Sequence, residues 1–488
     1  MLIQRVSFSA VSMSVVLFFS GIFAGIVEAA SPPAEVKTTD VKTAEVKMAE
    51  VKMAEMAVPM TRASMKTTTD QQLQAIVSQP QRPLASLSVI AIRAGEIVYE
   101  KQFGERFIPT TAAVGLPANA DTLFRIASVS KMVTALGVMR LVEQGKLALD
   151  TDVSRYLGYT LRNPYYPDAA ITLRMLLSHT SSLRDDGGYN FPASTSLQSV
   201  LQASEKNAVS ALIWARPDAS NKNYAPGTYF SYVNLNWGVI GAVMESVSGK
   251  RFDVLMQELI LQPLQISGSF HPENLSPAEL NNLATLYRKQ KNDVWDTAGA
   301  WQPQVDDYHQ QAVPKRTYLT TYQPGWNATL FSPQGGLRIS ARGLSRLMQM
   351  LMREGELDGV RLLQPASVRT LLTPRWRYDA ALQNGDDYQG MFQSWALGFQ
   401  VFTDISAAHH GDRLTPPVMP GGHGFTGVGH LGFAYGLESG FVFDPQTRNG
   451  MIYLIGGTGA DPDKNTGEYS SLSIWQEQIM TALAAQLR

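Results

Sequence analysis

Apolar and polar residues alternate in two short runs near the start of the readable part of the chain. The segment from Leu87 to Phe103 reads LSVIAIRAGEIVYEKQF, with β-branched and aromatic residues on both sides of Ala94-Gly95. Such runs around a turn signal are typical of a β-hairpin. The C-terminal strings GHLGFAY, SGFVFDP and NGMIYLIGG have the same character. Strands are therefore expected near both ends of the chain.

Helical patterns occupy the chain between these strands. The segment from Ser128 to Gly145 has helix formers with spaced apolar positions and stops at a glycine. The strings ITLRMLLSHTSSL, SLQSVLQASEKNAVSALIWA and WGVIGAVMESVSG make residues 156–330 a region of helices and loops. Further helices are expected at Leu344–Glu354 and at about 471–487.

This order of elements predicts an α/β fold in a domain covering residues 67–488. Strands at both ends with helices between them indicate an α/β part made from 67–155 and 331–488. The helical part, about 156–330, would be inserted between them. Within it, residues 270–330 have the least regular pattern.

The N-terminal residues 1–30 read as a signal peptide. One basic residue, Arg5, precedes an apolar run, and Val27-Glu28-Ala29 places small residues where a signal peptidase recognises them. Cleavage after Ala29 is expected. The alternative is an uncleaved membrane anchor, because about 18 apolar residues can span a bilayer. Both interpretations predict a periplasmic or secreted protein, and only the second involves a membrane.

Residues 31–66 contain a five-residue repeat. Valine recurs at positions 36, 41, 46 and 51, each time followed by lysine. A period of five keeps the valines on one face of neither a helix nor a strand. We therefore interpret residues 31–66 as a flexible, zwitterionic linker. A tether near the cell wall is an alternative role.

Composition narrows the possible functions. The chain has 488 residues, of which 44% are hydrophobic and 17% charged, with a net charge of −1. That balance gives no basic face for a nucleic-acid partner. Cysteine is absent, which excludes a thiol nucleophile, disulfides and thiolate-bound zinc. No metal or organic cofactor is implied.

The first candidate catalytic segment is SVSK at 128–131. Side chains three positions apart share a helix face, with Cβ atoms about 5–6 Å apart, so Lys131 can reach the Ser128 hydroxyl. Desolvation lowers the pKa of a lysine, and the free amine can then take the serine proton. A serine in the first helical turn also has a backbone N–H available to an oxyanion. Ser130 lies on another face and cannot play this part.

Two later segments could complete a site with this serine. Tyr232 offers a phenol that can carry a proton to a leaving group, and Asn234 offers a carboxamide that can contact both substrate and lysine. His430 and Gly432 mark a strand edge where a substrate backbone can approach. Taken alone, the Tyr232–Asn234 segment is better explained by a buried tyrosine and a turn asparagine. The alternative for His430 is a lone histidine in a glycine-rich loop.

Together the three segments resemble the serine β-lactamase and penicillin-binding superfamily, specifically the class C-like branch with D-alanyl-D-alanine carboxypeptidases and family VIII-type esterases. That branch has Ser-x-x-Lys, Tyr-x-Asn and Lys- or His-x-Gly in this order. The strings LLSHTSSL (176–183), PGTYFSYVN (226–234) and SPQGGLRISARGLSRLM (332–348) also match. The resemblance covers about residues 70–488. It implies a β-lactamase/transpeptidase-like fold, with an antiparallel sheet flanked by helices and an inserted helical domain.

The resemblance also implies catalytic roles. Ser128 would attack a carbonyl and form an acyl-enzyme. Lys131 would be the base, coupled to Tyr232, which would protonate the leaving group and help activate the deacylating water. The substrate would be a small molecule or a peptide, with peptidoglycan as a candidate partner.

Substrate-binding roles follow from the same resemblance. Asn234 would position the substrate amide or ester, and His430 would form hydrogen bonds near Tyr232 and the substrate. Gly432 would let the substrate backbone approach. The backbone N–H groups of Ser128 and Phe433 would form the oxyanion hole.

Two residues depart from the family pattern. Leu431 stands where the family has a threonine whose hydroxyl helps bind a substrate carboxylate, and His430 is a weaker cation than lysine at neutral pH. Both count against an efficient β-lactamase. Ser182 replaces a glycine, which we interpret as structural. His179 is expected to form structural hydrogen bonds away from the catalytic segments.

Three functions remain open from the sequence. The first is hydrolysis of an amide or ester through an acyl-enzyme, either as a D-alanyl peptidase with penicillin-binding character or as an esterase. The second is a non-hydrolytic protein that binds penicillin or peptidoglycan. The third is a true class C-like β-lactamase.

Overall fold

The computed structural model describes residues 62–110, 114–202, 208–220, 222–309, 311–405, 411–419 and 421–488. The predicted signal peptide and most of the predicted linker lie outside these ranges. Helix α2 (Arg62–Val77) begins within the range predicted as linker. In the described ranges, no helix has the length and apolar character needed to cross a bilayer.

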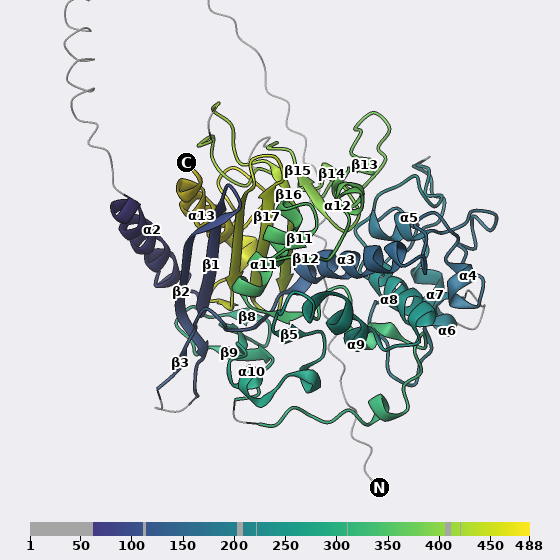
Figure 1. Ribbon diagram of the computed structural model, residues 1–488, viewed down its shortest axis with the longest axis horizontal. Helices are drawn as coiled ribbons and strands as arrows, with labels where there is room; N and C mark the ends of the chain where they lie inside the picture. Colours follow the sequence, from purple (N-terminus) through teal and green to yellow (C-terminus); the bar gives the residue numbers. More distant parts are fainter. Residues whose placement is uncertain are drawn as a thin grey trace, which may run out of the picture. The chain divides into compact units, whose positions relative to one another are not determined.

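A nine-stranded antiparallel sheet dominates the described residues (Figure 1). The predicted hairpin is confirmed as strands β1 (Ser86–Arg93) and β2 (Glu96–Phe107), with Ala94 and Gly95 in the left-handed region at its turn. Strand β1 lies beside β18 in a register that aligns Leu87 with Ile455, so both ends of the domain build one sheet. In spatial order the strands are β13 (Trp376–Arg377), β14 (Ser394–Trp395), β15 (Gln400–Phe402), β16 (Gly427–Ala434), β17 (Leu437–Asp444), β18 (Asn449–Ile455), β1 (Ser86–Arg93), β2 (Glu96–Phe107) and β3 (Leu116–Pro117).

Helices cover both faces of this sheet. Successive side chains of a strand point to opposite faces. Val89 accordingly packs in the apolar cluster of α2 and α13 (Ile474–Ala484). Ile90 packs in the cluster of α11 (Ala341–Met352) on the other face. The predicted fold class, an antiparallel sheet flanked by helices, is therefore confirmed.

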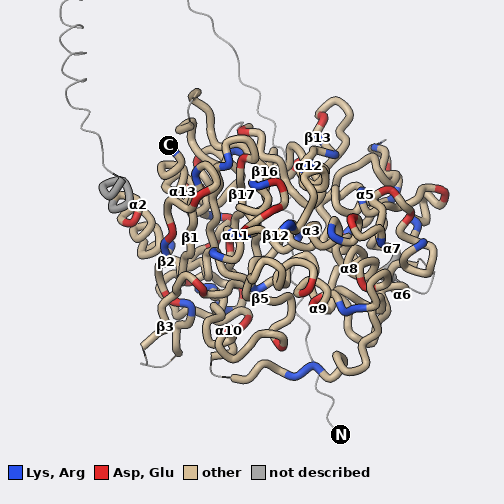
Figure 2. Tube along the Cα trace, in the orientation of Figure 1, with Lys and Arg blue, Asp and Glu red and all other residues tan. Residues whose placement is uncertain are grey.

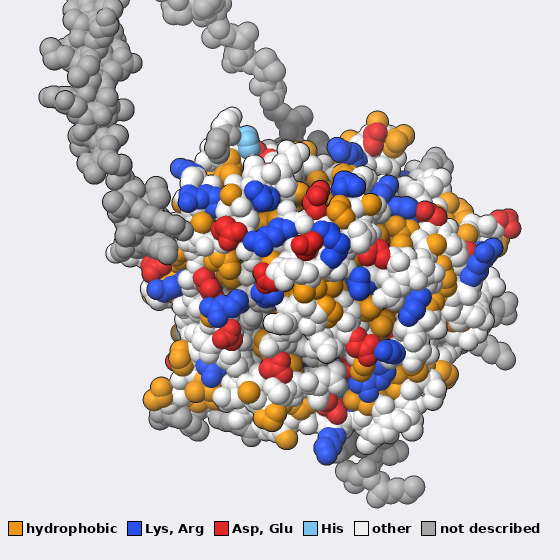
Figure 3. Space-filling view, viewed as in Figure 1, with side chains coloured by type: hydrophobic (Ala, Val, Ile, Leu, Met, Phe, Trp, Pro, Cys, Tyr) orange, Lys and Arg blue, Asp and Glu red, His pale blue; other side chains and the backbone are white. Residues whose placement is uncertain are grey.

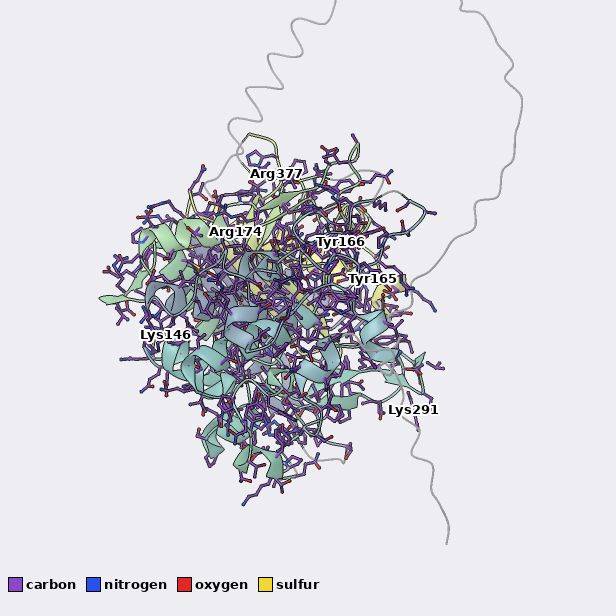
Figure 4. All side chains as sticks on the ribbon, turned by 90° about the vertical axis from the view of Figure 1, so that its right-hand side faces the viewer. Lys146, Tyr165, Tyr166, Arg174, Lys291 and Arg377 are labelled. Carbon is purple, nitrogen blue, oxygen red and sulfur yellow. The ribbon has the colours of Figure 1, made fainter. Side chains whose placement is uncertain are left out.

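The helical part packs around two helices, α3 (Ser130–Glu143) and α8 (Leu235–Ser248). Helix α8 is buried along most of its length and ends at Gly249, which adopts a left-handed conformation. Figure 4 turns this side toward the viewer, with Tyr165, Tyr166 and Arg174 labelled. The surrounding helices are α4 (Ser154–Leu157), α5 (Leu173–Leu177), α6 (Leu197–Leu201), α7 (Ala208–Leu212), α9 (Phe252–Met256) and α12 (Pro365–Leu372).

The helix predicted from ITLRMLLSHTSSL is much shorter than its pattern indicates. Thr172 caps α5, but the helix ends at Leu177. His179 and Ser182 both adopt positive φ, at 59° and 66°, which breaks the helix and starts a loop.

The helical part is predicted to extend to about residue 330. In the structure, residues 268–305 instead belong to the sheet-containing part. Strand β6 (Leu286–Arg288) pairs in parallel with β19 (Gly457–Thr458), close to the C-terminus. It pairs on its other side with β9 (Gln302–Val305). Short non-local pairings of this kind leave little periodic signal in the sequence. The remaining short elements here are β4 (Phe124–Arg125), β5 (Gly268–Ser269), β7 (Gln290–Lys291), β8 (Val294–Trp295), α10 (Pro277–Asn281), β10 (Arg338–Ile339), β11 (Glu356–Leu357) and β12 (Val360–Arg361).

Charged side chains of both signs are interspersed along the trace and over the face drawn in space-filling form (Figures 2 and 3). Several belong to exposed ion pairs, such as Arg342 with Glu100 at 3.1 Å. Exposed pairs contribute about 0–1 kcal/mol each. The surface charges therefore do little to fix the fold, which rests on the two apolar clusters.

Candidate active site

The candidate nucleophile lies on a short turn between the sheet and the helical part. Residues Ala127–Val129 form a 3₁₀ turn that runs directly into α3. Ala127 has φ 48°, a strained conformation for alanine, and such strain concentrates at functional sites. Ser128 is partly exposed, whereas Lys131 is completely buried. The turn thus presents the serine while the helix conceals the lysine.

The buried amine of Lys131 contacts three polar groups. Its Nζ lies 2.9 Å from Ser128 Oγ, 2.9 Å from Asn234 Oδ1 and 3.1 Å from the carbonyl oxygen of Gln334. Burial lowers the pKa of Lys131 from 10.5 to about 7, while the charge of Asp185 acts in the opposite direction. A substantial fraction of this amine is therefore unprotonated at neutral pH, and its lone pair can accept the serine proton.

The phenol of Tyr232 lies close to both Lys131 and Ser128. Its ring centroid is 4.9 Å from Lys131 Nζ, and its hydroxyl interacts with the Ser128 side chain. Burial raises the pKa of Tyr232 well above its ordinary value, although the hydrogen bond with Ser128 acts against this. The phenol therefore keeps its proton at neutral pH and can donate it.

Asn234, at the start of α8, is oriented by a carboxylate that the sequence analysis did not identify. Asp185 Oδ2 accepts hydrogen bonds from Asn234 N at 2.8 Å and from Asn234 Nδ2 at 2.9 Å. Asp185 Oδ1 accepts from Leu235 N at 2.9 Å. This fixes the carboxamide with its oxygen toward Lys131. Nothing in the local sequence RDDGG distinguishes Asp185 from an ordinary loop residue.

Strand β16 approaches the serine so closely that only glycine fits. A Cβ on Gly432 would lie 2.7 Å from Ile126 O and 3.1 Å from Ser128 N. Ser439 on the neighbouring strand donates to Ile126 O at 2.9 Å and holds the two segments together. The structure thus brings the third predicted segment beside Ser128, with Phe433 next along the strand.

The edge of β16 beside the serine is open in the described residues. Strand β15 pairs only with Gly427–Gly429, from Phe402↔Gly427 to Gln400↔Gly429. Residues from His430 onward therefore have a partner strand on one side only, β17. An open strand edge can bind extended backbone.

His430 faces the site as a neutral imidazole. Its Nδ1 lies 2.5 Å from the carbonyl oxygen of Leu431, and its ring is 6.1 Å from that of Tyr232. Burial, together with the charge of Lys131, lowers the pKa of His430 to about 3. Within the described residues its Nε2 has no hydrogen-bond partner, so the expected hydrogen bond near Tyr232 is not formed. Leu431 packs with the apolar cluster of α13, on the far face of the sheet.

The placement expected for His179 is wrong. Its Nδ1 accepts a hydrogen bond from Val233 N at 2.9 Å, inside the Tyr-Val-Asn segment. His179 is 1% exposed, and its ring stacks on the ring of Tyr232. The role is structural, as expected, but the residue lies against the catalytic segments. The turn after α5 brings His179 to this position. The sequence gives no sign of the turn, because the apolar pattern there is that of a continuing helix.

The described residues contain no group of three histidine or acidic side chains able to hold a metal ion. What the geometry offers is a serine, an amine of lowered pKa and a protonated phenol, set beside a backbone edge. This arrangement is suited to acyl transfer.

Comparison with known proteins gives distant relatives in sequence. Esterase EstB of Burkholderia gladioli is 32% identical over 206 residues, 40% of this chain and 49% of EstB. Protein flp of Staphylococcus aureus (strain MRSA252) is 23% identical over 243 residues, 48% of this chain and 46% of flp. The chain thus spans about half the length of these curated relatives.

A solved structure shows a similar fold. The octameric penicillin-binding protein homologue from Pyrococcus abyssi superposes with a TM-score of 0.55 at 20% identity, covering 83% of this chain and 75% of that one. In addition, the sequence model of the Beta-lactamase family matches residues 65–473, most of the chain. This chain therefore belongs to the Beta-lactamase family.

Proposed function

We propose that this chain is an exported serine hydrolase that cleaves an ester or amide bond through an acyl-enzyme on Ser128. The observation that carries the proposal is the amine of Lys131, fully buried and 2.9 Å from Ser128 Oγ. Its pKa of about 7 makes it a base at neutral pH.

Acylation follows from these contacts. Lys131 Nζ takes the Ser128 proton as Oγ forms a bond to the substrate carbonyl carbon. The negative charge that develops on the carbonyl oxygen is stabilised by the backbone N–H groups of Ser128 and Phe433. The tetrahedral intermediate collapses, the bond to the leaving group breaks, and Tyr232 donates its proton to that group. The proton held by Lys131 then returns to Tyr232, which leaves the acyl-enzyme.

Deacylation repeats the sequence with water as the nucleophile. The water loses a proton to the Lys131–Tyr232 pair and attacks the acyl carbon. The bond to Ser128 Oγ breaks, Oγ regains a proton, and the carboxylic acid leaves. Asn234, held by Asp185, keeps the substrate carbonyl aligned in both steps.

Esters fit this site better than carboxylate-bearing β-lactams. Leu431 has no hydroxyl to offer, and its side chain packs on the far face of the sheet. His430 is neutral because of its lowered pKa, so it brings no positive charge to a substrate carboxylate. The esterase among the relatives supports the same preference.

A D-alanyl peptidase is the second candidate. The open edge of β16 from His430 onward favours it, because an extended peptide can add to such an edge through backbone hydrogen bonds. Peptidoglycan stem peptides are substrates of this chemical kind. Export, which both candidates need, rests on residues 1–30.

The test is intact-protein mass spectrometry of the purified chain with benzylpenicillin, alongside hydrolysis of p-nitrophenyl butyrate. Ser128→Ala should abolish both adduct and ester hydrolysis. Ser130→Ala is the matched control, because Ser130 lies two residues further along, at the start of α3, and its Oγ accepts from Leu337 N. It should retain both.

Each outcome separates the candidates. Ester hydrolysis with benzylpenicillin untouched supports the esterase, and a persistent penicillin adduct supports the peptidase. Hydrolysed penicillin without an adduct indicates a β-lactamase. If the wild-type chain gives neither an adduct nor turnover of either compound, or if both survive Ser128→Ala, the hydrolase proposal fails.

A further inference from the structure

A pocket with a volume of about 270 Å³ opens beside the loop that carries Asp185. Its walls come from separate stretches of the chain and include Arg184, Leu212, Trp214, Arg216, Tyr224 and Asp386. None of these residues belongs to the catalytic set described above. The volume is at the lower end for ligand pockets, since those for drug-sized molecules measure about 300–1,000 Å³. A small metabolite therefore fits it better than a polymer.

Two arginines bring positive charge to this pocket. The guanidinium carbon of Arg184 lies 5.5 Å from the ring centroid of Tyr224 and 5.7 Å from that of Tyr229, so cation–π contacts hold it in place. Its Nη1 donates to the carbonyl oxygen of Leu183 at 3.0 Å. Arg216 is exposed. In the described part of the chain neither arginine forms a salt bridge with a carboxylate, so both can pair with an anionic group of a ligand.

Acidic side chains line the same pocket, Asp386 among them. The carboxylate of Asp386 accepts from the hydroxyl of Tyr229 at 2.6 Å and from that of Ser231 at 2.8 Å. A carboxylate has about four lone-pair sites, so Asp386 can accept further hydrogen bonds. Tyr229 contacts Arg184 through its ring and Asp386 through its hydroxyl. This shared contact places a cation and a carboxylate within reach of one small ligand.

The pocket also contains a donor without an acceptor. Trp214 is 2% exposed, and among the described residues its indole Nε1 has no hydrogen-bond partner. A buried polar group left unpaired costs about 1–3 kcal/mol, which a ligand oxygen at this nitrogen would recover. Leu212, 46% exposed, offers apolar surface in the same pocket. The walls thus provide cations, carboxylates, a free donor and an apolar contact.

We propose that this pocket binds a free apolar amino acid in its zwitterionic form. The ligand carboxylate pairs with the guanidinium groups of Arg184 and Arg216 and accepts from Trp214 Nε1. The ligand ammonium binds the carboxylate of Asp386, and the apolar side chain covers Leu212. A ligand of both charges fits better than a simple anion, because the acidic side chains in the walls would repel an anion that has no ammonium group.

Occupation of the pocket should affect the active site through Asp386. This residue holds the segment just before Tyr232, because it accepts from Tyr229 and Ser231 and its N donates to Phe230 O at 2.9 Å. An ammonium group on its carboxylate competes with the two hydroxyls and loosens that segment. A bound amino acid should therefore lower kcat. This effect rests on the proposed function, whereas binding itself does not.

The test is calorimetric titration of the purified chain with L-leucine and with D-leucine, alongside Ser128→Ala, in which turnover is excluded. Leucine in at least one configuration should bind both chains. Isocaproate lacks the ammonium group and isopentylamine lacks the carboxylate, so each should bind at least about tenfold more weakly than leucine. Arg216→Gln and Trp214→Phe should each weaken leucine binding about tenfold. Arg377→Gln is the matched control, at an exposed arginine outside the pocket (Figure 4), and should bind leucine like the wild-type chain.

Three results would overturn the site: no binding of either enantiomer, equal affinity for isocaproate and leucine, or wild-type affinity in both pocket variants. The last would mean that leucine binds elsewhere on the chain. A loss of affinity in either pocket variant, with Arg377→Gln unchanged, supports the site.

Hydrolysis of p-nitrophenyl butyrate is the second readout. Saturating leucine should lower kcat about fivefold or more. An unchanged kcat with leucine bound would overturn the coupling to Tyr232. If leucine binds to the wild-type chain and to Ser128→Ala but no ester or amide is turned over, the proposed function fails while the amino-acid site stands.

Discussion

The imidazole ring of His179 stacks on the phenol ring of Tyr232, with centroids 4.6 Å apart and planes inclined by 22°. The same histidine accepts the backbone N–H of Val233. One side chain thus supports both the ring of the proposed proton donor and the backbone that carries it. Burial, together with the charge of Lys131, lowers the pKa of His179 well below 6.5, so it does this as a neutral ring.

His179→Ala is expected to lower kcat about tenfold or more, because a buried N–H without a partner costs about 1–3 kcal/mol and Tyr232 loses its stacked neighbour. His179→Asn can still accept from Val233 N and should recover part of the loss. The matched control is His271→Ala. His271 is also buried, accepts a backbone N–H from Glu273 and lies outside the site. If both alanine variants lower Tm equally and neither changes kcat, His179 has no positioning role.

Activity should rise with pH through about 7, because only the unprotonated amine of Lys131 can take the Ser128 proton and its pKa is lowered to about 7. The measurement is kcat/KM for a neutral ester from pH 5 to 9. Lys131→Arg keeps the charge but cannot accept a proton, so kcat/KM should fall about 10²–10⁴-fold. Lys146→Arg, at an exposed lysine, is the control. A value of kcat/KM that still rises about tenfold per pH unit at pH 9, as an ordinary lysine pKa of 10.5 would give, would contradict this assignment.

Asp185 should affect the pH at which kcat/KM reaches half of its maximum. Its charge raises the pKa of Lys131, so Asp185→Asn should move the midpoint of the pH profile downward. The same change weakens the charge-assisted hydrogen bonds to Asn234 and should lower kcat/KM about tenfold. Asp186→Asn, at the exposed neighbouring carboxylate, should change neither quantity. An unchanged midpoint with reduced kcat/KM would leave Asp185 with a purely geometric role.

Much of the site could be predicted from sequence because its chemistry lies in short local patterns. The three-residue spacing of Ser128 and Lys131 determines that one side chain can reach the other, and the observed contact is 2.9 Å. The pattern around Gly432 predicts close approach of a substrate backbone, whereas the structure shows the serine turn at this glycine, where an added Cβ would lie 3.1 Å from Ser128 N. Alternation likewise located the long strands, since burial follows a period of two.

The supporting residues could not be predicted, because their contacts are non-local. Asp185 reaches Asn234 across a loop, and His179 reaches Val233 only after a left-handed turn ends α5. Neither contact leaves a period in the sequence. The strands within 268–305 leave no readable pattern for the same reason, since β6 pairs with β19 near the C-terminus.

Gly432→Ala tests how closely the strand must approach the serine. The new methyl group would lie 2.7 Å from Ile126 O and 3.1 Å from Ser128 N, so the strand must shift away. Because a displaced oxyanion donor costs about 10²–10³ in kcat, a loss of that order is expected. Gly335→Ala is the matched control, since its Cβ would meet Ala127 of the same turn at 3.6 Å, an ordinary contact. Wild-type kcat in Gly432→Ala would exclude the oxyanion site proposed at β16.

Glu438 should make stability depend on pH independently of the active site. It is 2% exposed on β17, accepts from Ser473 Oγ at 2.5 Å, and burial raises its pKa from 4.5 to about 7. Between pH 4.5 and 7 the folded state holds this proton more tightly than the unfolded chain does, so the free energy of unfolding falls as pH rises. Above pH 7 this loss of unfolding free energy is complete and amounts to up to about 3 kcal/mol.

Glu438→Gln removes this titration while keeping the size of the side chain and an oxygen for Ser473. It should raise Tm at pH 8 relative to the wild-type chain and change it little at pH 5, as measured by calorimetry at both values. Glu354→Gln, at an exposed carboxylate paired with Arg369 at 3.7 Å, should leave Tm unchanged at both. Equal shifts of Tm at pH 5 and pH 8 in Glu438→Gln would mean that altered packing, rather than loss of the buried charge, causes the change in Tm relative to the wild-type chain.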